Sequence, residues 1–526
     1  MIDMSRDAVM TVPALKKYIT YLAKMGYNSL MLYTEDTYEV EGEPFFGYMR
    51  GRYSVEELRE IDSFAASLGI EVIPCIQTLA HLATIARWGK VTMDMDGVLL
   101  TDNERTYALI ENMFKTISSC FSSKRIHIGM DEAHELGRGK HLDIHGYEDT
   151  VVIMKRHLER VVSIAERYGY SPLIWSDMFY RSWNGGLYTA LGENEELRIP
   201  DSVVESYPKN VIPVYWDYYY DTERHYRVML ESHKVLSPDT WFAGGVWTWR
   251  GFLPNNAFSI KSMCPAIDAC INTGTRNVFM TVWGDNGAEC SRYSVLPALL
   301  YIAEYARGNK DEAKIKAKFK RLFGAEYDDF MSLDIPNHVY EEVGRNSLVA
   351  KSALYSDLFL GYQDVVVKEG FSKTFEECAK KYNAAAKASR RWATVFKSAA
   401  RLCEALAIKY ELGVKTRAAY KSGDKEELLR LAREDYTKLL SRLKAFSGAF
   451  MNQWFEENKP NGYEVQDIRI GGVIKRTETC RARLIAYVSG KLDSIPELEE
   501  ELLAISTTAV ALNRNNYAQM ATCNVL

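Results

Sequence analysis

The stretch HIGMDEAHELGRG, residues 127 to 139, gathers side chains that could do chemistry. Two imidazoles (His127, His134) and three carboxylates (Asp131, Glu132, Glu135) lie within nine residues, directly after a strand-like run. Three chemistries could use such a cluster. The letters DEAH are those of a helicase nucleotide box, the imidazoles and a carboxylate could hold a metal, and adjacent carboxylates could form an acid/base pair.

The helicase interpretation requires a phosphate-binding loop of the pattern GxxxxGK[ST] upstream of the box. The Gly-Lys pairs at 89–90, 139–140 and 490–491 lack both the hydroxyl residue that should follow and the glycine that should precede by five positions. The net charge of −5 also argues against nucleic acid as the main ligand, because phosphate binding needs a basic surface. We therefore reject the helicase and expect no nucleic-acid partner.

The metal interpretation requires His127, Asp131 and His134 to converge on one point. His127 lies four residues before Asp131 in an extended run, so the two side chains can share a face, and His134 lies in the following loop. A metal-dependent barrel hydrolase is therefore an alternative. We prefer to interpret His127 as an imidazole inside a barrel, hydrogen-bonded to a neighbour, and predict no metal and no cofactor.

The carboxylate pair, Asp131 and Glu132, fits the pattern best. Adjacent strand residues point to opposite faces, so both can serve one site only where the strand ends and the backbone turns into a loop. An acid and a nucleophile on opposite sides of a sugar ring normally come from different strands. Adjacency instead favours a mechanism in which the substrate supplies the nucleophile. Glu132 would protonate the leaving oxygen, and Asp131 would hold a substrate amide next to the reacting carbon.

Strand-like and amphipathic helical segments alternate through the first 310 residues, which is typical of a parallel sheet. Helices are expected over residues 13–27, 54–69 and 104–121. Eight strand-like runs end at positions 6, 36, 81, 132, 178, 219, 249 and 285, and each carries a charged or aromatic residue where it stops. Eight strands close a (β/α)8 TIM barrel, whose active site lies at the C-terminal strand ends. We predict this α/β barrel for residues 1–310.

From about residue 311 the chain becomes rich in Lys, Glu, Ala and Leu with apolar residues at helical spacing, which predicts an all-α domain over 311–526. The chain has no apolar run long enough to cross a membrane, and its start lacks the pattern of a secretory signal. Nine scattered cysteines without a CxxC pattern fit reduced thiols. We expect a cytoplasmic protein that does not associate with membranes.

The HIGMDE motif, followed by a tryptophan-lined barrel, resembles glycoside hydrolase family 20, the β-N-acetylhexosaminidases. Their signature is His-x-Gly-x-Asp-Glu at the end of the fourth barrel strand. The chain resembles especially the bacterial exo-N-acetylglucosaminidase branch, which has a helical C-terminal domain. The resemblance covers roughly residues 1 to 300 well and the helical part more loosely. Glycosidases of this family are substrate-assisted.

This resemblance implies an exo-acting, retaining β-N-acetylhexosaminidase that removes terminal N-acetylglucosamine or N-acetylgalactosamine from glycans. Glu132 resembles the general acid/base. Asp131 resembles the residue that orients the 2-acetamido group and stabilises the oxazolinium ion formed when its carbonyl oxygen attacks C1. The alternatives are an O-GlcNAcase-like hydrolase and a non-catalytic sugar-binding barrel. The presence of both carboxylates favours an enzyme over a binding barrel.

The resemblance also implies polar substrate contacts. Arg6, in a DxSR pattern, looks like the arginine that hydrogen-bonds the 3- and 4-hydroxyls. His81, in QTLAH, and Glu35 or Asp36 look like a histidine–acid chain behind the catalytic glutamate, which would tune its pKa. Asp285, in Trp-Gly-Asp, stands where the family usually has a glutamate that binds the 4- and 6-hydroxyls.

The aromatic residues complete the implied site. Trp175, Trp249 and Trp283 look like walls around the acetamido methyl and the sugar face. The sixth strand reads WDYYY where the family usually has Trp-Tyr, so the tyrosine that donates to the acetamido oxygen is either Tyr218 or Tyr219, and we choose Tyr218. Two further departures are an alanine for the glycine before the histidine, and a chain that begins inside the first strand without the usual preceding α/β domain, as a truncated start would.

The helical half carries two more predictions. Its many amphipathic helices commonly bury a face against a partner, so we expect a homodimer with this half at or near the interface. The segment NKPNGYEVQDIRIGG, residues 458–472, is expected to be a loop. It either lies near a sugar site, through Tyr463, Gln466, Asp467 and Arg469, or connects two helices without a ligand role.

Overall fold

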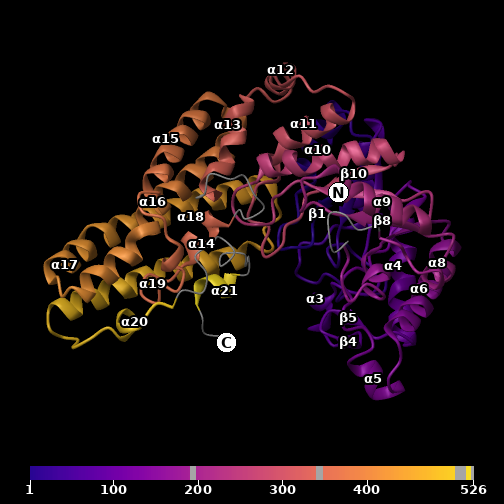
Figure 1. The fold of residues 1–526 in the computed structure, drawn as a ribbon, viewed down its shortest axis with the longest axis horizontal. Helices are drawn as coiled ribbons and strands as arrows, with labels where there is room; N and C mark the ends of the chain where they lie inside the picture. The colour runs from indigo at the N-terminus through magenta and orange to yellow at the C-terminus, as the bar shows by residue number, and fades with distance from the viewer. Residues whose placement is uncertain (190–196, 339–347, 504–516, 523–526) are drawn as a thin grey trace.

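The computed structural model describes residues 1–189, 197–338, 348–503 and 517–522. Figure 1 shows two lobes: the strands and their helices, coloured indigo to magenta, form one, and the orange-to-yellow helices form the other.

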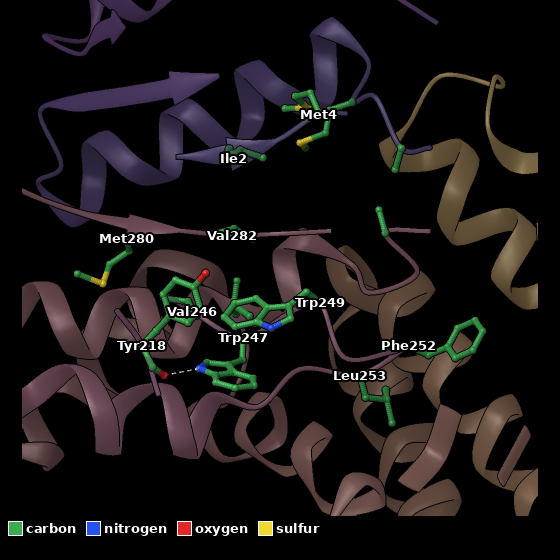
Figure 2. Packing of buried hydrophobic residues seen from close by; sticks show 14 of the residues in the cluster. Ile2, Met4, Tyr218, Val246, Trp247, Trp249, Phe252, Leu253, Met280 and Val282 are labelled. Atoms are coloured by element: carbon green, nitrogen blue, oxygen red, sulfur yellow. Dashed lines mark hydrogen bonds between the residues drawn. The ribbon is translucent and has the colours of Figure 1, made fainter. Parts of the chain in front are cut away.

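Eight parallel strands form the ring that the sequence predicted. They are β1 (Ile2–Asp3), β2 (Ser29–Tyr33), β3 (Glu71–Cys75), β6 (Arg125–His127), β7 (Ser171–Trp175), β8 (Ile212–Trp216), β9 (Trp241–Gly245) and β10 (Val278–Thr281), paired in this order. The ring closes between its first and last strands. The Asp3 N–H donates to the Val282 carbonyl (3.1 Å), and the Val282 N–H donates to the Met1 carbonyl (3.0 Å), beside the Ile2–Val282 pair drawn in Figure 2. The predicted (β/α)8 barrel is confirmed.

Alternate residues of the strands fill the interior of the ring, because side chains on a strand point to opposite faces in turn. Met31 and Tyr33 on β2, and Leu173 and Trp175 on β7, pack together there. The last inward residue of such a strand therefore faces the C-terminal mouth of the barrel. Tyr33 and Trp175 occupy that position.

The predicted helices over 13–27, 54–69 and 104–121 form as α1 (Val12–Met25), α2 (Val55–Ser67) and α4 (Glu104–Ser118). Helix α2 shows why the sequence was informative. Ser54 Oγ accepts from the Glu57 N–H (3.1 Å) while Glu57 Oε2 accepts from the Ser54 N–H (2.9 Å), which is a capping box. Gly69, with φ of +73°, lies just beyond the C-terminus in the left-handed region that glycine favours. The other helices around the ring are α6 (Thr150–Arg167), α9 (Glu223–Leu236), α10 (Asn256–Thr273) and α11 (Leu296–Ala306).

Short elements occupy several connections around the ring. These are α3 (Ala83–Ala86), the antiparallel pair β4 (Met93–Met95) and β5 (Val98–Leu99), α5 (Lys140–His145), α7 (Asp177–Arg181) and α8 (Asp201–Ser206).

The part of the chain described after α11 contains helices and no strand, as predicted for an all-α C-terminal part. Its longer helices are α12 (Glu312–Phe323), α14 (Val349–Tyr355), α15 (Ser372–Ala388), α16 (Ala393–Lys421), α17 (Lys425–Arg433), α18 (Asp435–Glu457) and α19 (Tyr463–Val488). The domain boundary at residue 310 falls between α11 and α12 and stays a prediction.

The prediction of a loop over 458–472 is wrong, because α19 begins at Tyr463. Glycines inside a helix cost about 1 kcal/mol each relative to alanine, so the adjacent Gly471 and Gly472 favour a loop when only the local sequence is considered. Side chains at alternating four- and three-residue spacing outweigh that cost by lying buried along one face of the helix: Gln466, Ile470, Val473, Thr477, Cys480 and Leu484. The true connection is short and ends at Gly462, whose φ is +92°.

None of the described helices combines the length and the apolar character that a membrane crossing needs. The eight cysteines in the described ranges form no disulfide.

Candidate active site

The C-terminal ends of the strands surround one cavity. Eight of the ten predicted site residues line it: Arg6, His81, Asp131, Glu132, Trp175, Tyr218, Trp283 and Asp285. Tyr33, Trp216 and Tyr219 complete the lining. The remaining two predicted residues lie one layer behind. Glu35 Oε1 is 3.2 Å from Arg6 Nη2, and the Trp249 ring centroid is 5.0 Å from that of Tyr218.

An unusual backbone brings the two adjacent carboxylates to the same cavity. Strand β6 ends at His127, and Gly129, Met130 and Glu132 then have φ of +72°, +69° and +53°. Residues other than glycine rarely adopt this left-handed backbone conformation, and such conformations concentrate at functional sites. A Cβ on Gly129 would lie 2.1 Å from Gln77 Oε1, so only glycine fits there. The turn leaves the Asp131 side chain 14% exposed and that of Glu132 42% exposed.

Asp131 is held as a carboxylate by two neighbours. Its Oδ1 accepts a hydrogen bond from Gln77 Nε2 (2.8 Å), and its Oδ2 lies 3.2 Å from His81 Nε2. Burial alone would raise the pKa of Asp131, but the charge of His81 and these contacts lower it to about 2. Burial would likewise lower the pKa of His81, but the charge of Asp131 raises it to about 9. At neutral pH the two groups therefore form an ion pair.

Gln77 links Asp131 to the arginine side of the cavity. Its amide also donates to the Tyr33 hydroxyl (2.9 Å) and its Oε1 accepts from the Met130 N–H (3.1 Å). The Tyr33 hydroxyl donates in turn to Glu35 Oε1 (3.0 Å). Neither Gln77 nor Tyr33 was predicted from the sequence. Gln77 is the first residue of the QTLAH motif that also contains His81, and Tyr33 is the last inward residue of its strand. The position of each residue at a strand end could therefore have indicated a place in the site.

The predicted histidine–acid chain behind Glu132 is arranged differently. His81 Nε2 is 3.7 Å from Glu132 Oε2 and therefore lies closer to Asp131. Of the two candidate acids, Glu35 is the one that joins the network, through Arg6 and Tyr33, whereas Asp36 Oδ1 accepts from Arg50 Nε (3.3 Å). His81 therefore pairs with Asp131 and not with Glu132, because the Asp131 carboxylate is the nearer of the two.

A third carboxylate, Asp177, lies under the pair and was missed. It is fully buried at the start of α7, directly after β7. Its Oδ2 accepts from the Glu132 backbone N–H (3.0 Å), and its Oδ1 accepts from Trp216 Nε1 (3.4 Å). Burial, together with the negative charge of Asp131, raises the pKa of Asp177 to about 7. Asp177 thus anchors the backbone of Glu132. The rule that strand ends carry site residues could have found it.

Tryptophan and tyrosine rings form the walls. The Trp283 ring lies 4.9 Å from Tyr33, edge to face, and 6.2 Å from Trp175. Trp216, which was not predicted as a site residue, stacks on Tyr218 with ring centroids 5.8 Å apart. Such flat, apolar faces suit the face of a sugar ring or a methyl group.

Trp249 and the two candidate tyrosines, Tyr218 and Tyr219, lie near these walls. The Trp249 ring stacks on that of Trp247 with centroids 4.4 Å apart and is not part of the cavity lining. Figure 2 shows both rings beside Tyr218. The Tyr218 and Tyr219 rings lie 4.6 Å apart and both line the cavity, so both remain candidates for a donor to the ligand.

His127 has the interior position that we preferred for it. Its ring is buried 4.2 Å from Trp175, and its Nδ1 accepts from the Gly129 N–H (3.1 Å). Burial lowers its pKa to about 3, so it is neutral.

Two other groups in the described ranges have metal-ligand spacing: His81 with Asp131 and Glu132, and Asp102 with His141 and Glu148. In the first group His81 Nε2 lies 3.2 Å from Asp131 Oδ2, and the charge of Asp131 raises the pKa of His81 to about 9. In the second group Arg156 forms ion pairs with both carboxylates. Ion pairs therefore explain both groups.

Residues 1–241 match the family model described as "Glycosyl hydrolase family 20, catalytic domain", and residues 328–516 match "Glycoside Hydrolase 20C C-terminal domain". Hexosaminidase D of Homo sapiens is 25% identical over 232 residues, which are 42% of this chain and 45% of that protein. Hexosaminidase D of Bos taurus is 27% identical over 235 residues, 41% of this chain and 62% of that protein. The chain thus spans about half the length of these curated relatives. A β-N-acetylhexosaminidase structure from Bacteroides fragilis aligns with 62% of this chain and 70% of its own, at 17% identity and a TM-score of 0.46.

Proposed function

The chain belongs to glycoside hydrolase family 20, and we propose that it is an exo-acting β-N-acetylhexosaminidase that releases terminal β-linked N-acetylglucosamine or N-acetylgalactosamine from glycans with retention of configuration. One observation carries the proposal. Asp131 and Glu132, adjacent in sequence, line the same tryptophan-walled cavity, and Asp131 is paired with a protonated His81.

This arrangement suits substrate-assisted catalysis. The carbonyl oxygen of the substrate's 2-acetamido group attacks C1 while the glycosidic bond breaks, which leaves a positively charged oxazolinium ring. The Asp131 carboxylate accepts the acetamido N–H and stabilises the positive charge as it develops. Glu132, more exposed, protonates the leaving oxygen and then takes a proton from the water that opens the ring. A tyrosine of the pair 218–219 donates to the acetamido oxygen.

The polar end of the cavity supports exo action. Arg6, paired with Glu35, and the half-buried Asp285 would hold the 3-, 4- and 6-hydroxyls of the sugar. Hydroxyls held in this way cannot carry a further sugar, so the bound residue has to be the terminal one. The walls formed by Trp175 and Trp283 would pack on the sugar face and on the acetamido methyl.

Hydrolysis of an aryl 2-acetamido-2-deoxy-β-glucoside, compared with the plain aryl β-glucoside, tests the proposed function. We expect kcat/KM to be at least about 10³-fold higher for the acetamido substrate, because only that substrate carries its own nucleophile. NMR should detect the β-anomer of the released sugar first. Equal rates on the two substrates would contradict the proposal, and binding of N-acetylglucosamine without hydrolysis would indicate a sugar-binding barrel instead.

Asp177→Asn should change how stability depends on pH. Because burial and Asp131 raise the pKa of Asp177 from 3.8 to about 7, the folded state retains a proton that the unfolded state has lost across this window. The stabilisation from this group is complete below about pH 4 and disappears as pH rises through about 7. Asparagine removes this dependence and can still accept from the Glu132 N–H.

The measurement is urea unfolding of both proteins at pH 5 and pH 8. Between pH 5 and pH 8 the free energy of unfolding of the wild type should fall by on the order of 1 kcal/mol or more relative to that of the variant. A difference between the two proteins that is independent of pH would show that Asp177 does not titrate in this range.

We also propose a homodimer with the helical half at its interface. Three apolar side chains near the α18–α19 turn support it: Met451 and Phe455 are 40% and 45% exposed, and Ile468 is 72% exposed. Light scattering should give twice the chain mass of 60.0 kDa, and Ile468→Glu should shift the protein toward monomer. A wild-type mass of a single chain would remove the proposal.

A further inference from the structure

Three side chains of the helical half reach the loop that carries Asp285. Arg469 on α19 donates from Nη1 to the Asn286 carbonyl and from Nη2 to Asn286 Oδ1, both at 2.9 Å. Gln466, one turn earlier on α19, donates from Nε2 to the Gly287 carbonyl (3.0 Å). Lys351 on α14 donates from Nζ to the Asn286 carbonyl (3.3 Å). The backbone directly after Asp285 is therefore bonded to a part of the chain far away in sequence.

This loop has a conformation that needs support. Asn286, Gly287 and Ala288 have φ of +52°, +116° and +49°, three consecutive residues in or near the left-handed region. Non-glycine residues there persist only where the surroundings fix them. A Cβ on Gly287 would lie 2.6 Å from Arg469 Nη1 and 2.8 Å from Gln466 Nε2, so α19 packs directly on the loop.

A buried ion cluster fixes the orientation of the supporting side chains. Glu289 lies between the two cations, with Lys351 Nζ at 2.8 Å and Arg469 Nη1 at 3.5 Å. The side chains of Lys351 and Glu289 are 0% and 1% exposed, and that of Arg469 is 15% exposed. With few other conformations open to it, the Arg469 guanidinium holds Asn286 from a fixed position.

The same region also contacts the loop that carries Arg6. The Lys459 N–H donates to the Val9 carbonyl (2.7 Å), and the Thr11 N–H donates to the Glu457 carbonyl (3.0 Å). Gly462 packs on the Asp7 carbonyl, where a Cβ would lie 2.1 Å from the oxygen. The α18–α19 turn and the start of α19 therefore contact the two loops whose residues line the polar end of the cavity.

We propose that Arg469 is a positioning residue for Asp285, through which the helical half sets the affinity of the cavity for the hydroxyl end of the sugar. This inference rests on the proposed function, in which Asp285 binds those hydroxyls. Loss of the guanidinium lets the Asn286 backbone relax and moves the Asp285 carboxylate. The reacting end of the cavity, with Asp131 and Glu132, is bonded through Gln77 and Asp177 and keeps its geometry.

The test uses the full-length protein with Arg469→Met, Arg469→Lys and a matched control. Arg481 lies on the same helix, donates to the Ala432 carbonyl (2.9 Å) and so serves as the control in Arg481→Met. Each protein is assayed with an aryl 2-acetamido-2-deoxy-β-glucoside and with its 6-deoxy analogue. The wild type should prefer the hydroxylated substrate. Arg469→Met should raise KM for it about 10-fold, leave kcat close to the wild-type value, and lose most of the preference.

Arg469→Lys should retain part of the preference, because one ammonium can replace one of the two hydrogen bonds to Asn286, and Arg481→Met should behave as the wild type. An equal loss on both substrates, or an unchanged preference in Arg469→Met, would overturn the proposal. Should that variant not fold, an unchanged preference in Arg469→Lys would overturn it. A wild type that hydrolyses both substrates equally would also overturn it and leave the proposed function standing. A wild type that hydrolyses neither would overturn both.

Discussion

Glu132→Gln should lower kcat by roughly 10² to 10⁴ on ordinary glycosides, the usual contribution of a general acid. Glutamine has nearly the shape of glutamate but cannot transfer a proton to the leaving oxygen. The fold should not change, because the Glu132 side chain is 42% exposed and the contact that fixes the residue, from its backbone N–H to Asp177, remains.

The leaving group separates this role from a structural one. Activity should partly return with an aryl substrate whose leaving group departs without a proton. Glu135→Gln makes the same chemical change at an exposed position three residues further along the same loop and should leave kcat unchanged. Near-normal turnover of ordinary glycosides by Glu132→Gln would rule out Glu132 as the acid.

Asp131→Asn should lower kcat by about 10² to 10³, because it removes a charge that stabilises the transition state more than the bound substrate. The KM should change much less. The substitution also removes the negative charge that raises the pKa of His81 to about 9, so that pKa should fall, which NMR titration of the imidazole can follow.

The exposed Asp143→Asn serves as a matched control for charge and should retain both kcat and the pKa of His81. A thiazoline analogue of the oxazolinium ion should inhibit the wild type strongly and the Asp131→Asn variant weakly. No inhibition of the wild type, together with a covalent sugar trapped on Asp131, would show that the aspartate is itself the nucleophile.

The barrel and most of the lining could be predicted because their signals are local. Each strand end carries its own polar or aromatic residue. Eight such strand ends along the chain predict a barrel, and in a barrel these residues lie together around the C-terminal opening. Asp131 and Glu132 illustrate this, since their adjacency already required a strand end. Asp177 follows the same rule, since it lies one residue before the predicted strand end at position 178, but it was not predicted as a site residue.

Other parts of the site depend on contacts that no local pattern encodes. Glu35 and Asp36 are equivalent in sequence, and only their partners, Arg6 and Arg50, separate them. Arg469 and Asn286 are 183 residues apart, so nothing near either residue points to the other. The start of α19 was predicted as a loop because the cost of two glycines is a local signal, whereas the burial of its apolar stripe depends on neighbouring helices.

Stepwise fluorination of the substrate's acetamido methyl tests most directly whether the substrate supplies the nucleophile beside Asp131. Each fluorine withdraws electrons from the amide carbonyl and makes its oxygen a poorer nucleophile, while the size of the group changes little. With one aryl leaving group and the acetyl, fluoroacetyl, difluoroacetyl and trifluoroacetyl substrates, we predict that kcat/KM falls steeply at every step. Rates that do not depend on fluorination would contradict a substrate-assisted mechanism.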